Sequence, residues 1–176
     1  MTRLPHPHDD KDLLSSLKHI HPHLSQACSS GITDIVEKAL EKNPEWLEQR
    51  SDDGETCLHL TGIMGKAETA EFLLKKGANP NIRSTSEKGL RMHPLSWNVY
   101  AGHVPASKVL LEHGADVNLP YDDLGNDGTQ VTVWDTLSKF LETAPEGSPQ
   151  AERYFKMKEL LTQYGAKSFA DLEPEL

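Results

Sequence analysis

Apolar residues recur at helical spacing along most of the chain, in short helices that come in pairs. Within residues 52–84, Ala70, Leu73 and Leu74 form an apolar stripe at positions i, i+3 and i+4, which is typical of an amphipathic helix. Gly65 stands before this helix, where a left-handed residue can end a preceding one. The pattern therefore predicts a helix–turn–helix unit that repeats at about 33 residues.

The same unit recurs before and after this stretch. Leu24 lies 34 residues before Leu58, Leu95 lies 37 residues after Leu58, and Trp134 lies 39 residues after Leu95. The growing distance places extra residues in the loops between units. We expect four units, at residues 22–51, 52–84, 85–121 and 122–168, after a flexible leader with a short capping helix at 1–21 and before an acidic tail at 169–176.

The stretch 52–84, DDGETCLHLTGIMGKAETAEFLLKKGANPNIRS, resembles an ankyrin repeat. The positions that match the family pattern are Gly54, Thr56, Leu58, His59, Gly65, Leu73, Leu74, Gly77, Ala78 and Asn81. The resemblance covers roughly residues 22–168 and implies an all-α ankyrin-repeat solenoid with degenerate capping repeats at its ends. In such a fold the first helices and the finger loops line a concave groove, and the second helices form the outer wall.

Two positions depart from the family pattern. Cys57 stands where the family usually has proline, which we interpret as a small local loss at a helix start and not as a site. Asn43 and Pro44 replace the usual Gly-Ala at the end of the first unit, and asparagine tolerates the left-handed conformation expected there. Since Cys28 and Cys57 are too few for a disulfide framework, and the N-terminus lacks a secretory pattern, we expect a cytoplasmic or nuclear protein.

Composition narrows the classes of partner. The chain has 176 residues and a net charge of −9, with a pI near 5.4. This balance argues against nucleic acid and anionic membranes and favours a partner protein with a basic surface. The mean hydropathy of −0.56 is low for one globular core but suits a solenoid with a thin core. No segment reaches transmembrane length, and we expect a monomer.

The resemblance implies that the two positions before each inter-helix glycine face the groove. At these positions stand Ile63, Met64 and Tyr100, in the middle of the groove, and Phe140 in the last unit. Apolar and aromatic side chains with a polar rim are typical of protein-binding surfaces. The alternative is that the long loop within 82–92 folds over them. Acidic rim residues are Asp52, Asp53 and Glu55, and the expected partner-binding residues are Ile63, Met64, Tyr100, Arg83, Lys88, Arg91, Trp97 and Phe140.

Histidines suggest a second class of function. They cluster near the N-terminus at His6, His8, His19, His21 and His23. Proline separates several of them and no cysteine or carboxylate completes a zinc spacing, so we favour solvated histidines and predict no metal and no cofactor. The resemblance makes His59 a structural residue that bridges repeats, and His103 has a similar role in its turn.

The stretch Leu110–Asn118, LLEHGADVN, resembles the ankyrin-repeat segment that asparaginyl hydroxylases recognise in animals. Asn118 is therefore a candidate for hydroxylation, and the alternative is a structural role in the loop turn. The sequence has no nucleophile motif, phosphate-binding glycine loop or paired catalytic carboxylates, so we predict that it is not an enzyme. We predict a non-catalytic protein-interaction module that acts as adaptor, inhibitor or assembly chaperone. The alternative is a metal-binding or enzymatic protein that uses the N-terminal histidines.

Overall fold

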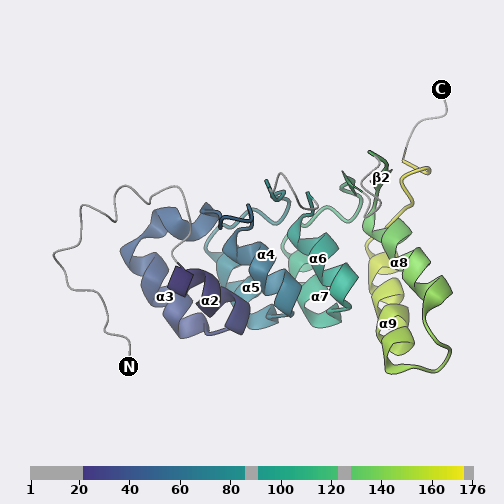
Figure 1. Ribbon diagram of the computed structural model, residues 1–176, viewed down its shortest axis with the longest axis horizontal. Helices are drawn as coiled ribbons and strands as arrows, with labels where there is room; N and C mark the ends of the chain where they lie inside the picture. The colour runs from purple at the N-terminus through teal and green to yellow at the C-terminus, as the bar shows by residue number, and fades with distance from the viewer. Residues whose placement is uncertain (1–21, 86–90, 123–127, 173–176) are drawn as a thin grey trace.

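The computed structural model describes residues 22–85, 91–122 and 128–172, and within these residues the helices stand in a row of pairs (Figure 1). The first pair is α2 (Pro22–Ser30) and α3 (Thr33–Lys42), the second α4 (Cys57–Met64) and α5 (Ala67–Lys75), the third α6 (Pro94–Ala101) and α7 (Val104–Glu112), and the fourth α8 (Val133–Thr143) and α9 (Pro149–Gln163). A short 3-10 helix, η1 (Pro44–Glu48), follows α3.

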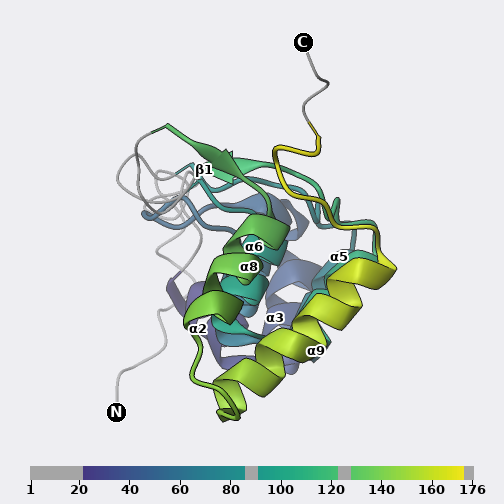
Figure 2. The ribbon, with the colours of Figure 1, turned by 90° about the vertical axis from the view of Figure 1, so that its right-hand side faces the viewer.

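The helices form two layers. Helices α2, α4, α6 and α8 contact one another in succession, and α3, α5, α7 and α9 do the same beside them. Figure 2 shows the two layers end-on, with the finger loops along the upper edge of the row of helix pairs. The finger before α8 contains a short antiparallel pair, β1 (Tyr121–Asp122) and β2 (Gln130–Val131). The predicted all-α solenoid is confirmed.

Left-handed glycines follow the first three inner helices, at Gly31, Gly65 and Gly102. Gly65 ends α4 with φ 66°, in the left-handed region that disfavours a Cβ atom. A Cβ there would lie 2.5 Å from Nδ1 of His103 in the next pair. The turn glycine therefore serves both to reverse the chain and to let successive pairs approach.

The end of the first pair differs from the expectation. Asn43 is not left-handed; its φ is −137°, because a residue before proline avoids the helical regions. Its backbone N–H and its side-chain amide both donate to the carbonyl of Ala39, at 3.0 and 3.3 Å. Asn43 thus ends α3 with its side chain, and Pro44 begins η1.

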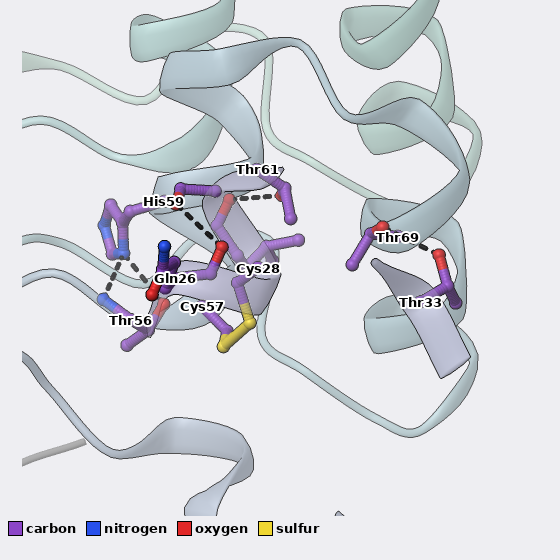
Figure 3. The surroundings of a disulfide bond; sticks show 10 residues. Gln26, Cys28, Thr33, Thr56, Cys57, His59, Thr61 and Thr69 are labelled. Atoms are coloured by element: carbon purple, nitrogen blue, oxygen red, sulfur yellow. Dashed lines mark hydrogen bonds between the residues drawn. A yellow bond between two sulfur atoms is a disulfide. The ribbon is translucent and has the colours of Figure 1, made fainter. Parts of the chain in front are cut away.

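The two cysteines form a disulfide, so the interpretation of Cys57 as a residue without a role is wrong (Figure 3). Cys28 lies on α2 and Cys57 is the first residue of α4, and their Cα atoms are 5.5 Å apart. The two positions are far apart in sequence, but the stacking of α2 on α4 brings them together. The bond also removes the cysteine count as a ground for the expected cytoplasmic or nuclear location.

The hydrophobic core lies between the layers and runs along the row of pairs. Each pair contributes leucines that are almost fully buried, such as Leu24, Leu58, Leu95 and Leu137. Among the described helices, none combines the length and the apolar character that crossing a bilayer requires.

Candidate functional site

Apolar side chains are exposed on the inner helices, where the sequence places the groove. Met64, the last residue of α4, is 50% exposed, and Tyr100 on α6 is 41% exposed. Ile63 is half-buried beside Met64. Residues 86–90 of the long loop that the alternative places over them lie outside the described residues.

Aromatic rings continue this surface from the third pair to the fourth. Trp97 and Tyr100 meet edge to face, with ring centroids 6.1 Å apart. Tyr100 meets Phe140 of α8 at 5.5 Å, and Phe140 stacks on Tyr154 of α9 at 5.3 Å. The structure therefore brings Trp97, Tyr100 and Phe140 together, and the half-buried Phe140 also serves as packing between two pairs.

A buried carboxylate fixes the indole of Trp97. The Nε1–H group of Trp97 donates to Oε1 of Glu55 at 3.3 Å, and Glu55 is only 6% exposed. Burial raises the pKa of Glu55 to about 7, although the Ser84 hydroxyl, the Trp97 indole and the Arg50 charge oppose this rise. Glu55 is thus a buried link between the second and third pairs and not an exposed rim charge.

The basic residues of the finger loops have different surroundings. Arg83 is half-buried and its guanidinium donates to the carbonyl of Pro120, while its own carbonyl accepts from Nη1 of Arg50 at 2.7 Å. Arg83 therefore links neighbouring fingers. Arg91 is exposed, and Lys88 lies outside the described residues.

Two histidines are buried at the starts of inner helices. Nδ1 of His59 accepts from the backbone N–H of Thr56 at 3.1 Å, and burial lowers the pKa of His59 to about 3. Nδ1 of His93 accepts from the N–H of Ser96 at 3.3 Å, and burial lowers its pKa to about 4. Both rings are therefore neutral at physiological pH and act as helix caps.

Hydrogen bonds from histidines also join neighbouring units. Nε2 of His93 donates to the carbonyl of Leu119 in the next finger at 3.1 Å. Nε2 of His103 donates to the carbonyl of Ile63 in the preceding pair at 3.2 Å. Sequence reasoning identified the role of His103 but missed His93, whose signal was its place before the helix-starting Pro94.

Asn118 holds the third finger against the fourth pair. Its Nδ2 group donates to the carbonyl of Gly165 at 3.2 Å, and its Oδ1 atom accepts from the N–H of Lys167 at 2.8 Å. Asn81 makes the equivalent bonds one repeat earlier, to Gly114 and Asp116. This geometry gives Asn118 a structural role, and its hydroxylation stays a prediction.

The described residues contain no group of three or more histidine, cysteine, aspartate or glutamate side chains that could hold a metal ion. Of the N-terminal histidines, His23 is exposed, and the other four lie outside the described part of the chain.

Comparison with known proteins gives one family match. The family model for ankyrin repeats in three copies matches residues 24–121, which is more than half of the 176 residues. The human transient receptor potential cation channel subfamily A member 1 is 37% identical over 98 residues, which cover 54% of this chain and 8% of the channel protein.

Two further relatives match a longer part of the chain. The rat serine/threonine-protein kinase TNNI3K is 34% identical over 124 residues, 64% of this chain and 15% of the kinase. The human BCL-6 corepressor-like protein 1 is 30% identical over 118 residues, 67% of this chain and 6% of that protein. The chain thus spans only a small part of each of these relatives.

Proposed function

Because this chain belongs to the ankyrin-repeat family, whose repeats generally serve as protein–protein interaction modules, we propose that it binds a partner protein along its inner helices. The observation that carries this proposal is the exposure of Met64 and Tyr100 on neighbouring inner helices. Trp97 and Phe140 extend the same surface. We call Ile63, Met64, Trp97, Tyr100 and Phe140 the inner strip.

The composition of the inner strip supports a protein as ligand. Aromatic residues and methionine are enriched at the centres of protein interfaces, where a few such side chains supply most of the binding energy. The finger loops supply a polar rim, to which we assign Arg91 and, in the same loop, Lys88. Arg83 supports this rim by holding its finger loop in place through its hydrogen bond to the carbonyl of Pro120. The net charge of −9 favours a partner with a basic surface.

We further propose that the chain acts without catalysis, as an adaptor, inhibitor or assembly chaperone. The kinase and channel activities of the relatives do not support the same activities in this chain, because it spans only 15% of the kinase and 8% of the channel. Four properties remain predictions: a monomeric state, a cytoplasmic or nuclear location, no cofactor, and no binding to nucleic acid or membranes. Light scattering tests the monomeric state, cell fractionation tests the location, and filter binding tests nucleic-acid binding.

Variants of the inner strip test the proposed binding. Tyr100→Ala removes the exposed ring, and Ile63→Glu places a charge beside Met64. We expect both variants to lose the proteins that the wild-type chain captures in affinity purification, with an unchanged circular dichroism spectrum.

Phe155→Ala is the matched control. Phe155 is 57% exposed and lies on the outer helix α9, away from the inner strip. The control should retain the captured proteins. Capture by Tyr100→Ala and Ile63→Glu at the wild-type level would contradict the assignment of the inner strip.

A further inference from the structure

The disulfide between Cys28 and Cys57 lies where the first helix pair meets the second. Figure 3 shows the bond between α2 and the start of α4. The two cysteines are 0% and 1% exposed, and they are separated by 29 positions in the sequence. The bond is therefore a covalent connection between successive repeats, inside their packed interface.

Among the described residues, the outer helix of the first pair has few buried contacts that hold it in place, whereas α2 buries Leu24 and Ala27 beside Cys28. Helix α3 buries only Val36 and Leu40, whereas the equivalent helix α5 buries Thr69, Ala70, Leu73 and Leu74. Ile32 and Ile35, around the start of α3, are 46% and 49% exposed. Less buried apolar surface means a weaker hydrophobic contribution from α3 to docking, so the first pair is held on the second mainly through α2 and its covalent bond to α4.

Polar contacts to the second pair include one part-buried pair of hydroxyl groups and one exposed hydrogen bond. The hydroxyl groups of Thr33 and Thr69 are 2.8 Å apart at the starts of the two outer helices (Figure 3). Oε1 of Glu48 accepts from the backbone N–H of Asn79 at 2.7 Å, in an exposed position. Bonds of this kind contribute little net free energy, because water replaces them when they break.

We propose that the Cys28–Cys57 disulfide is a redox latch that keeps the first helix pair docked on the second. In a repeat protein, each repeat is held mainly by its interface with its neighbours, and local units can open while the rest stays folded. With the bond intact, α2 stays attached to α4 and the first pair stays docked. After reduction, the first pair separates from the second pair and docks on it again, as a local unit.

Reduction needs a dithiol, and its chemistry proceeds by exchange. A thiolate of the dithiol attacks one of the two sulfur atoms, the S–S bond breaks and a mixed disulfide forms. The second thiol of the dithiol then displaces this sulfur, so that the reductant leaves as a disulfide. Cys28 and Cys57 together gain two electrons and two protons. Because both sulfur atoms are buried, the attack requires α2 to move away from α4.

The latch also bears on the inner surface. Among the described helices, α2 is one end of the inner layer, and it contacts α4, which carries Ile63 and Met64. Opening of the first pair therefore shortens the surface that a partner meets. This part of the inference rests on the proposed function.

Hydrogen–deuterium exchange of the full chain, oxidised or reduced with dithiothreitol, tests the latch. The mass increase of about 2 Da on reduction confirms that the bond was present and has opened. We expect amides of residues 24–40 to exchange at least about tenfold faster after reduction, while those of residues 94–163 keep their rates. The double variant Cys28→Ala/Cys57→Ala should exchange like the reduced chain, with or without dithiothreitol.

Unchanged exchange of residues 24–40 after reduction contradicts the latch, and so does a chain that shows two thiols under non-reducing conditions. Faster exchange over the whole chain also contradicts it, since the effect is then not local. Partner capture separates the two proposals. If the oxidised and reduced chains capture the partner equally, and Tyr100→Ala still captures less, then only the effect of the disulfide on partner binding is contradicted. Wild-type capture by Tyr100→Ala instead contradicts the proposed function.

Discussion

The junction between the first and second helix pairs is closed by a covalent bond, whereas the junction between the third and fourth is filled by aromatic rings. Cys28 and Cys57 join α2 to α4. At the other end, Phe140 of α8 contacts Tyr100 of α6 and stacks on Tyr154 of α9. The same architecture therefore uses two kinds of contact between repeats, and only the aromatic one also presents an exposed ring.

The middle junction shows how the repeat register accommodates such different contacts. Gly62 and Pro94 occupy the positions equivalent to Cys28 and Cys57, and a Cβ at Gly62 would lie 2.9 Å from the carbonyl oxygen of Pro94. The backbones at this position approach closely in the middle of the stack. One register position thus holds either a close backbone contact or a disulfide, and side-chain chemistry decides which.

The largest expected effect comes from breaking the first junction. Removing the disulfide with Cys28→Ala/Cys57→Ala should lower the free energy of unfolding by about 3.5 kcal/mol, since the bond closes a loop of about 30 residues in the unfolded chain. Urea unfolding under non-reducing conditions measures the loss. Dithiothreitol should reproduce it in the wild type and leave the variant unchanged. A loss below about 1 kcal/mol would contradict the stabilisation assigned to the bond.

The next effect comes from breaking the aromatic junction. Phe140→Ala should lower the free energy of unfolding by about 2 kcal/mol, because the half-buried ring loses its contacts with Tyr100 and Tyr154. Thermal unfolding followed by circular dichroism measures the change. The exposed Phe155 serves as control, and Phe155→Ala should stay within about 0.5 kcal/mol of the wild type. Equal effects of the two variants would show that Phe140 is not a packing residue.

The sequence was enough to predict the solenoid and the exposure of Met64 and Tyr100, because both follow from the repeat register. Turn glycines such as Gly65 and the positions before them have fixed places in each unit. The disulfide was missed because it depends on contact between units, although Cys28 and Cys57 could have been placed by mapping both onto neighbouring repeats. The burial of Glu55 was missed for the same reason, since it depends on Trp97 from the next pair.

Glu55 gives an effect on stability that depends on pH. Its pKa is about 7 in the folded chain and 4.5 ordinarily, so between these values the folded chain binds more protons than the unfolded one. Its contribution to the free energy of unfolding therefore falls as pH rises through this range. Glu55→Gln lacks this dependence, so its stability relative to the wild type should rise by about 3 kcal/mol between pH 4 and pH 8.

Urea unfolding of both proteins at the two pH values measures this difference. His59 and His93 have lowered pKa values of about 3 and about 4, so the unfolded chain binds more protons below their usual range and acid destabilises the fold. Since both proteins contain these histidines, their effect cancels in the comparison. A stability difference between the two proteins that is the same at pH 4 and pH 8 would contradict the raised pKa of Glu55.

Photo-crosslinking from the inner strip tests the central claim most directly. A benzophenone amino acid in place of Tyr100 lies on the inner layer, and the same group in place of Phe155 lies on the outer layer, with little expected change in stability for either exposed site. We predict that a captured partner crosslinks at position 100 and not at position 155, and that Ile63→Glu removes the crosslink. Crosslinking at position 155 alone would contradict binding along the inner helices.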